Sequence, residues 1–174
     1  MKLRHGFTLL ELIVVVFIIS LIYSLVFSNM QKRENKPKVL TPLNLKDNVF
    51  RLINGEGEFF CVSKCKECYY SQTNSTNIKR FKGKLALGEL EVYILDSDDN
   101  FQRVEYGRVD DEKLCIRYNI YSNKSSSQIV IKNRDGVFYI PSYFGESKKV
   151  NDLDEAKEIW LKYSDNISSM GDFY

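Results

Sequence analysis

The hydrophobic pattern divides the chain into one long apolar run and a longer region of mixed polarity. Residues 7–27 contain neither Gly nor Pro, and their polar interruptions are Thr8, Glu11, Ser20 and Ser24. A helix of about 21 residues is roughly 32 Å long, enough to cross the hydrocarbon core of a bilayer. The pattern therefore predicts an N-terminal helix that lies in a membrane or in another apolar environment.

The sequence becomes polar after residue 30, and Pro37 and Pro42 disfavour a helix at the residues before them. We therefore expect the first helix to end or bend between residues 35 and 41. A short second helix is expected over residues 43–53. Its apolar face consists of Leu45, Val49, Leu52 and Ile53.

Most of the remaining sequence is typical of β-strands. Residues 113–121 alternate clearly, and their apolar face consists of Leu114, Ile116, Tyr118 and Ile120. Residues 85–95 and 101–109 are expected to pair across a turn at 96–100. Residues 128–132 and 137–140 form a second predicted hairpin, in which Gly136 supplies a positive φ.

A C-terminal helix is indicated by Asp152 and Glu155, which resemble a capping box. Its apolar face consists of Leu153, Ala156, Ile159, Trp160 and Tyr163. Trp160 is expected to be a packing anchor. Together the elements predict an α+β fold, with the long N-terminal helix packed through its second half on an antiparallel sheet of about five strands, followed by the short C-terminal helix.

Composition excludes several classes of function. The 174 residues leave room for one compact domain besides the N-terminal helix. A net charge of +2 argues against binding dominated by phosphate contacts. His5 is the single histidine, so triads and zinc proteases lack an imidazole in the rest of the chain. No P-loop or GxGxxG motif is present, and we expect neither enzymatic activity nor a cofactor.

Glu11 is an acidic residue inside the apolar run. A carboxylate near the centre of a membrane helix costs roughly 2.5 to 3.5 kcal/mol on insertion scales, so its presence indicates a function. Cleavage between Gly6 and Phe7 would place a new α-amino group about one helical turn from Glu11. This amine is largely positive at neutral pH. If it binds Glu11 of a neighbouring chain, it determines the stagger between the two helices.

Residues 4–12 resemble the processing and methylation motif of type IV prepilins and type II secretion pseudopilins. In that family a short basic leader ends in Gly, a Phe becomes the mature N-terminus, and a Glu follows four residues later, as at Gly6, Phe7 and Glu11 here. The resemblance implies cleavage by prepilin peptidase after Gly6, N-methylation of Phe7 and a role of Glu11 in assembly. It also implies the pilin fold.

The resemblance implies four segments. They are a leader peptide at residues 1–6, a transmembrane and filament-core helix at 7–33, a linker at 34–48 and a globular head domain outside the cytoplasm at 49–174. The positive-inside rule alone does not decide the orientation, because more basic residues follow the apolar run than precede it. Resemblance to prepilins places the leader in the cytoplasm.

Four cysteines are present, at positions 61, 65, 68 and 115. Outside the cytoplasm they are expected to be oxidised, and four cysteines allow three pairings. The simplest pairing joins Cys65 with Cys68 and Cys61 with Cys115. A four-cysteine zinc site and a redox-active Cys65/Cys68 pair are the alternatives.

Asp96, Asp98 and Asn100 match the first alternating ligands of an EF-hand loop. Phe101 and Gly107, however, stand where that loop requires Gly and Glu, so a solvated turn is the preferred interpretation.

Residues 79–84 combine four basic residues with Phe81. They are interpreted either as a solvated loop with one buried ring or as a site that contacts DNA phosphate while the ring stacks on a base.

The resemblance implies a minor pseudopilin, a non-catalytic structural subunit of a pseudopilus in a type II protein secretion system or a similar machine. Its partners would be other pilin or pseudopilin subunits, prepilin peptidase and an inner-membrane assembly platform with a cytoplasmic ATPase. It would cross the bacterial inner membrane once and then enter a periplasmic pseudopilus. The alternatives are a minor pilin of a competence or type IV pilus that takes up DNA, and a membrane-tethered cysteine redox or zinc protein.

Overall fold

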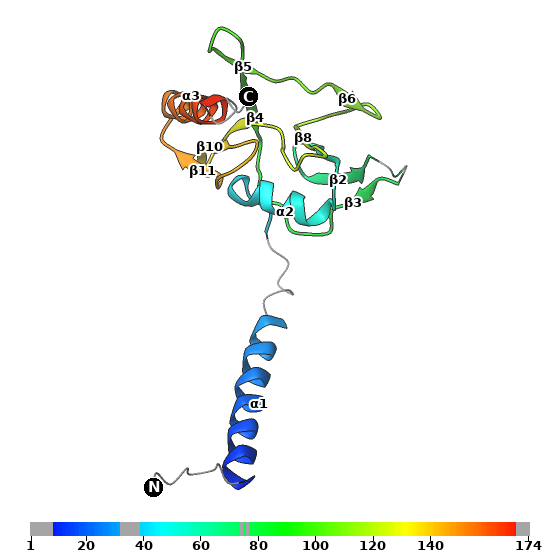
Figure 1. The fold of residues 1–174 in the computed structure, drawn as a ribbon. Coiled ribbons are helices and arrows are strands. Elements are labelled where there is room, and N and C mark those ends of the chain that lie inside the picture. Colours follow the sequence, from blue (N-terminus) through cyan, green and yellow to red (C-terminus); the bar gives the residue numbers. More distant parts are fainter. Residues whose placement is uncertain (1–8, 32–38, 74, 76, 170–174) are drawn as a thin grey trace. The chain divides into compact units, whose positions relative to one another are not determined.

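The computed structural model describes residues 9–31, 39–73, 75 and 77–169, and it divides the chain into two compact units. The first unit, Met1–Pro37, contains the helix α1 (Leu9–Gln31). The second unit, Lys38–Tyr174, which we call the head, contains every other helix and strand of the described residues (Figure 1).

Between residues 9 and 23, the helix α1 exposes apolar side chains all around its axis. Large hydrophobic residues between positions 9 and 23 have exposed fractions from 46% at Ile19 to 78% at Leu9. Within the described part of the chain, no helix is both long and apolar enough to span a bilayer. The predicted end of the first helix between residues 35 and 41 falls mainly on residues 32–38, which lie outside the described ones.

The head begins with a 3-10 turn, η1 (Pro42–Asn44), and the helix α2 (Leu45–Leu52). The predicted apolar face of this second helix is confirmed, because Leu45, Val49 and Ile53 are at most 1% exposed. Leu40 is also fully buried. The structure therefore places residues 40 and 45, which lie in the predicted linker, in the core of the head.

A five-stranded antiparallel sheet has the strand order β11-β10-β9-β4-β5. Its strands are β4 (Glu91–Leu95), β5 (Phe101–Arg103), β9 (Ile129–Asn133), β10 (Gly136–Ile140) and β11 (Lys148–Val150). Both predicted hairpins are confirmed, although β4 and β5 are shorter than expected. Gly136 has a φ of 136°, a backbone angle that residues other than Gly rarely adopt.

A second, four-stranded sheet was not predicted, and it has the order β3-β2-β1-β8. Its strands are β1 (Gly57–Val62), β2 (Glu67–Gln72), β3 (Lys79–Arg80) and β8 (Ile116–Ile120). The alternation in β8 is confirmed, since Ile116, Tyr118 and Ile120 are at most 2% exposed. The strand β1 is buried along almost its whole length, so its sequence does not alternate. A small ribbon of β6 (Arg108–Val109) and β7 (Glu112–Lys113) precedes β8.

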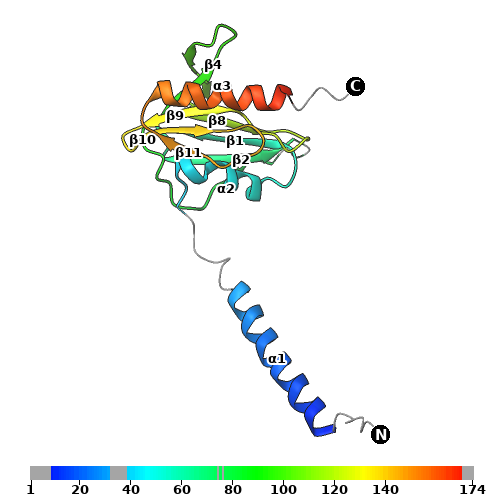
Figure 2. The ribbon, with the colours of Figure 1, turned by 60° about the vertical axis from the view of Figure 1, so that its left-hand side comes forward.

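The helices α2 and α3 (Leu153–Ser169) lie on opposite sides of the strands (Figure 2). On β9, Ile129 and Ile131 belong to the main core, which includes the buried face of α2, whereas Val130 packs in a second cluster with Ala156 of α3. Trp160 anchors α3 as predicted, with its ring 6.0 Å from the rings of both Phe101 and Tyr139. The central strands are thus buried on both faces.

The predicted cap of α3 forms in part. The Asp152 carboxylate accepts a hydrogen bond from the amide of Glu155 at 2.9 Å. The Glu155 carboxylate accepts from the amide of Asn151 at 2.7 Å, whereas a capping box would use the amide of Asp152.

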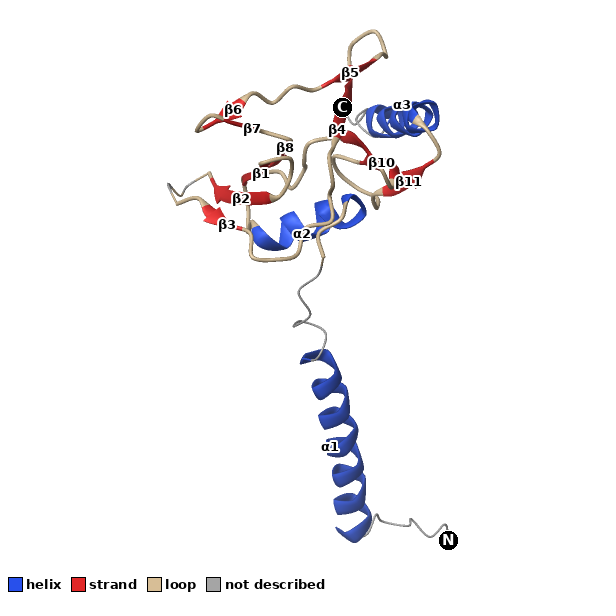
Figure 3. Ribbon diagram, turned by 180° about the vertical axis from the view of Figure 1, so that it is seen from behind, coloured by secondary structure: helices blue, strands red, loops and turns tan. Residues whose placement is uncertain are grey.

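The structure is therefore α+β, with an N-terminal helix, antiparallel sheets and a C-terminal helix (Figure 3). The expectation of a single sheet is wrong, because β8 pairs with β1 and not with the strands of the two hairpins. That α1 packs on a sheet stays a prediction.

The burial of α2 predicts unequal effects of two leucine substitutions. Leu45→Ala should lower the free energy of unfolding by about 2 to 5 kcal/mol, because Leu45 is fully buried. The matched control is Leu43→Ala. Because Leu43 is 44% exposed, this substitution should lower the free energy of unfolding by about 0.5 kcal/mol. Chemical denaturation of the full chain in detergent measures both, and equal effects would contradict the packing of α2.

Candidate functional site

Of the residues predicted for processing and assembly, the structure describes Glu11 but neither Gly6 nor Phe7. Gly6 and Phe7 lie outside the described residues, whereas Glu11 lies in the first turn of α1 and is exposed. The N-terminal turn of a helix carries a partial positive charge, which favours a carboxylate at this position. The helix therefore presents one acidic group near the start of an otherwise apolar surface.

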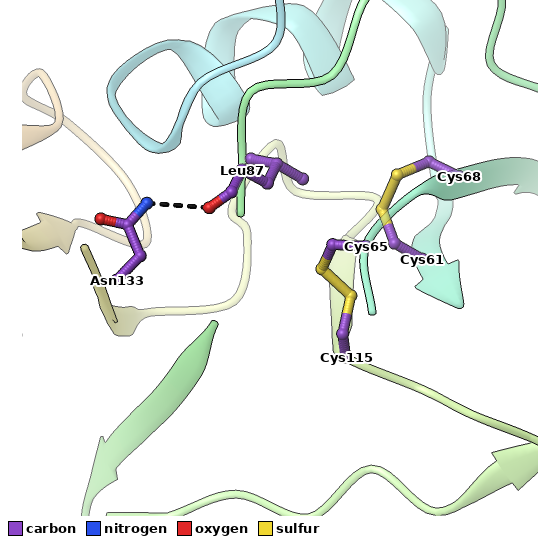
Figure 4. Close-up of a disulfide and its surroundings, with 6 residues drawn as sticks. All are labelled: Cys61, Cys65, Cys68, Leu87, Cys115 and Asn133. Carbon is purple, nitrogen blue, oxygen red and sulfur yellow. Dashed lines mark hydrogen bonds between the residues drawn. A yellow bond between two sulfur atoms is a disulfide. The ribbon is translucent and has the colours of Figure 1, made fainter. Parts of the chain in front are cut away.

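The cysteines form two disulfides, Cys61–Cys68 and Cys65–Cys115 (Figure 4). The pairing preferred from the sequence, Cys65 with Cys68 and Cys61 with Cys115, is wrong. Cys61 and Cys68 are directly opposite each other in the β1–β2 hairpin, with their Cα atoms 4.0 Å apart. Cys65 lies in the loop of this hairpin and reaches Cys115, which precedes β8 on the other side of β1.

The loop of the β1–β2 hairpin has an unusual backbone. Ser63, Lys64 and Cys65 have φ angles of 52°, 58° and 62°. Left-handed conformations cost roughly 1 to 2 kcal/mol for each residue other than Gly, so three in succession need support from outside the loop. The disulfide to Cys115 supplies it, together with the bond from the Ser63 hydroxyl to Glu112 at 2.6 Å.

The sulfur atoms of Cys61, Cys65 and Cys115 lie within 4.8 Å of one another. A zinc site would need four thiolates. In this structure all four sulfurs are instead bonded in pairs, and Cys65 and Cys68 do not form the redox pair considered from the sequence. The cysteines therefore act as two adjacent crosslinks.

Beside the disulfides lies a cleft of about 1060 Å³, which we call the basic cleft. One wall contains Cys65 and Cys68, and another contains Asn133. The Asn133 amide donates a hydrogen bond to the carbonyl of Leu87 at 2.8 Å, which holds the chain before β4 against the β9–β10 turn (Figure 4). The walls are thus fixed by covalent bonds on one side and by a hydrogen bond on the other.

The basic cleft carries more positive than negative charge. Its cations are Lys64, Lys66, Arg80, Lys82 and Arg134. Its carboxylates are Glu67, Glu89 and Asp135. Lys64 pairs with Glu89 at 2.9 Å, and Arg80 pairs with Glu67 at 3.1 Å.

The remaining cations are not neutralised by ion pairs. None of the described carboxylates lies within 4.0 Å of the charged nitrogens of Lys66, Lys82 or Arg134. The pKa of Glu89 is lowered by its hydrogen bond and charge interaction with Lys64, and also by Arg134 and Lys66. The cleft therefore offers a positive potential to an incoming anion.

Phe81, at the edge of this cleft, is a packing residue. Its ring lies edge-on to Phe59 with centroids 6.1 Å apart, and it packs against the main core. The interpretation of residues 79–84 as a solvated loop with one buried ring is therefore confirmed only in part, because Lys79–Arg80 form the strand β3 and the Phe81 ring is partly buried. The contacts of the ring with the core limit its use for stacking on a base.

The segment 96–100 is an exposed turn, as preferred from the sequence. One carboxylate oxygen of Asp96 accepts from the amides of Asp98 at 3.0 Å and Asn100 at 2.8 Å, and the other accepts from the amide group of Gln102 at 2.9 Å. These hydrogen bonds lower the pKa of Asp96. The Asp96 side chain thus shapes its own turn.

Sequence reasoning missed most of the basic cleft. Its charged residues come from four separate segments of the chain, and only Arg80 and Lys82 belong to a cluster visible in the sequence. Lys66 and Arg134 become neighbours of that cluster only through the pairing of the strands. No local signal marked them.

Comparison with known proteins gives one match. Residues 1–26 match the family model described as the prokaryotic N-terminal methylation motif. No curated protein and no solved structure matches the chain. The matched residues include Gly6, Phe7 and Glu11.

The disulfide pairing can be mapped directly. Trypsin cleaves after Lys and Arg, which places the four cysteines in four different peptides. In a non-reduced digest, mass spectrometry should find peptide 65–66 linked to peptide 114–117, and the Cys61 peptide linked to the Cys68 peptide. Both links should disappear after reduction. A link between peptide 65–66 and the Cys68 peptide would contradict the structure.

Removing each disulfide should also have unequal effects on stability. Cys65 and Cys115 are 50 residues apart, whereas Cys61 and Cys68 are 7 apart. In the chain-entropy model the longer loop contributes about 4 kcal/mol and the shorter about 2.4 kcal/mol. The paired serine variant at 65 and 115 should therefore unfold at lower denaturant than the one at 61 and 68. The opposite order would contradict this account.

Proposed function

We propose that this chain, whose N-terminal methylation motif supports a type IV pilin-like family, is a structural subunit of a pseudopilus in a type II protein secretion system or a similar machine. The motif supports processing by prepilin peptidase and N-methylation. On this chain the peptidase would cleave after Gly6, and the methylated residue would be Phe7. The subunit would have a structural and not a catalytic role.

The observation that carries the proposal is Glu11 on an apolar helix directly after a peptidase motif. Burying a Leu, Ile, Val or Phe side chain contributes roughly 1.5 to 3 kcal/mol. Outside the membrane, the apolar surface of α1 between residues 9 and 23 therefore favours packing among helices over exposure to water, far more strongly than one carboxylate opposes it. Such packing is nearly indifferent to stagger, because residues 9–23 are apolar apart from Glu11 and Ser20.

Glu11 would make one stagger between packed helices more favourable than the others. A buried carboxylate is costly unless it is paired, and N-methylation leaves the terminal amine basic. The most stable stagger between packed helices would therefore be the one in which Glu11 of one subunit forms an ion pair with the amine of Phe7 on its neighbour. In this proposal hydrophobic burial holds the helices together once they have left the membrane, and the ion pair selects the register.

The motif suggests a membrane-anchored protein. We propose that residues 7–33 lie in the bacterial inner membrane before assembly, with the head outside the cytoplasm. The two disulfides support this location of the head, because disulfides persist in oxidising compartments. The helix would then exchange lipid contacts for contacts with other subunits.

The pilin-type motif suggests assembly with other pilin subunits and recognition by prepilin peptidase. We propose in addition an inner-membrane assembly platform driven by a cytoplasmic ATPase. A competence pilus that takes up DNA is the second candidate, and the unpaired cations Lys66, Lys82 and Arg134 favour it. The packed position of Phe81 weakens it. Secretion and transformation assays of a deletion strain separate the two, and we expect secretion to be lost and transformation to be unchanged.

Mass spectrometry of the native protein tests the processing step. The mature chain should begin at Phe7 and carry a methyl group on its α-amine. In a strain without prepilin peptidase, the chain should begin at Met1. An intact Met1 in the wild-type strain would contradict the proposal and favour the membrane-tethered alternative.

Substitution of Glu11 tests its role in assembly. Glu11→Ala should be cleaved normally but enter filaments more than tenfold less, because a buried amine without its partner costs roughly 3 to 5 kcal/mol. The control is Ser20→Ala, since the Ser20 hydroxyl donates a hydrogen bond to the carbonyl of Val16 in the same helix at 2.8 Å. Immunoblots of sheared filaments measure incorporation. Wild-type incorporation of Glu11→Ala would rule out the registry role.

A further inference from the structure

The turn between β4 and β5 presents two carboxylates on an ordered backbone. Asp96 holds the turn through the hydrogen bonds to Asp98, Asn100 and Gln102. Asp98 and Asp99 are exposed, and no described cation forms an ion pair with either. A turn that is already ordered loses little conformational entropy on binding. This segment, residues 96–100, is called the acidic turn below.

The β6–β7 ribbon also has acidic residues at its tip, but it contains cations of its own. Arg108 donates two hydrogen bonds to the carbonyl of Asp111, at 3.0 and 2.7 Å. Lys113 pairs with Glu105 at 2.6 Å. The acidic turn at 96–100 is therefore the better ligand for a positive surface.

The basic cleft matches the acidic turn in charge and in size. Lys66, Lys82 and Arg134 are exposed and without ion pairs, so the cleft keeps a positive balance for an incoming pair of carboxylates even with the unpaired Asp135 counted. Its volume of about 1060 Å³ lies just above the range of roughly 300 to 1,000 Å³ that holds small ligands. The tip of a β-turn can enter such a space.

Within one head the two surfaces lie at opposite ends of the same strand. Glu89 of the cleft precedes β4, and Asp96 directly follows it. A five-residue strand is roughly 17 Å long, and the hairpin projects away from α2 (Figure 1). The acidic turn therefore cannot enter the cleft of its own head, and the two surfaces can meet only between molecules.

We propose that, in the filament, the acidic turn of one subunit docks into the basic cleft of a second copy of this chain, with Asp98 and Asp99 facing Lys66, Lys82 and Arg134. The inference rests on the proposed function as a filament subunit. Because the two surfaces differ, the contact is heterologous, the kind of contact that is compatible with an open helical filament when its rotation does not close. It deepens that function by naming the contact that orients the heads.

The strength of such a contact suits a filament. Exposed ion pairs contribute about 0 to 1 kcal/mol each, too little to join two free heads. Packing of the N-terminal helices would hold the heads near each other at an effective concentration on the order of millimolar. The contact would then choose the orientation of each head, and high salt would weaken it.

Photo-crosslinking in filament-producing cells tests the contact with the full chain. A benzoylphenylalanine at position 82 should link to peptide 85–103, which contains the acidic turn, of a second copy carrying a different tag. The matched control places the same label at Lys148, exposed on the edge strand β11, and should give no link to that peptide. Links from position 82 only to other regions, or only to another pilin subunit, would overturn the proposal.

Charge reversal provides an independent test. Arg134→Glu and Asp98→Lys, made singly, should each reduce the yield of the crosslink from position 82 at least fivefold. When every copy of the chain carries both substitutions, the yield should be restored. Asp154→Lys, at an exposed position of α3, is the control and should leave the crosslink unchanged. Loss in the double variant as severe as in the single ones would overturn the contact.

These outcomes are distinguishable from failure of the proposed function. If the chain is not a filament subunit, the wild-type protein keeps Met1 or is missing from sheared filaments. If the wild-type protein begins at Phe7 and enters filaments but gives no link to peptide 85–103, only the head contact is refuted.

Discussion

The disulfide between Cys65 and Cys115 is the constraint on which the rest of the head depends. It ties the loop of the β1–β2 hairpin to the residue that leads into β8, and so joins both neighbours of β1 covalently. It also supports three successive left-handed residues, which would relax without it. Lys64 of that loop then reaches Glu89, and the wall of the basic cleft follows from this geometry.

The two units of the chain differ in whether their apolar side chains are buried. The head buries its apolar residues in its own core, to which α2 contributes Leu45, Val49 and Ile53. The helix α1 leaves its apolar side chains exposed between residues 9 and 23, so it needs lipid or other helices around it. A subunit built in this way can exchange one apolar environment for another while its head stays folded.

Charge has a selective role in both units of the proposed filament. In the helix, a single carboxylate at Glu11 would distinguish one stagger from many that are similarly apolar. In the head, the acidic turn and the basic cleft would distinguish one orientation from others. Neither interaction supplies much net free energy, because desolvation offsets the attraction of buried pairs and water screens exposed ones. Outside the membrane, hydrophobic burial would provide most of the free energy of packing, and the charges would determine which arrangement forms.

The sequence by itself determined the features that arise from neighbouring residues. The alternation in β8, the β9–β10 hairpin with Gly136, the face of α2 and the role of Asp152 at α3 depend on side-chain period, turn chemistry and capping, which act over a few residues. The processing motif at Gly6 and Phe7 is likewise a local signal. Tertiary structure alone decided the strand β1, the assignment of β8 to a second sheet, the disulfide partners and the basic cleft. The physical reason is that strand register sets Cys61 opposite Cys68, and that loops distant in sequence bring Lys66 and Arg134 together, so neither result is encoded in any short segment.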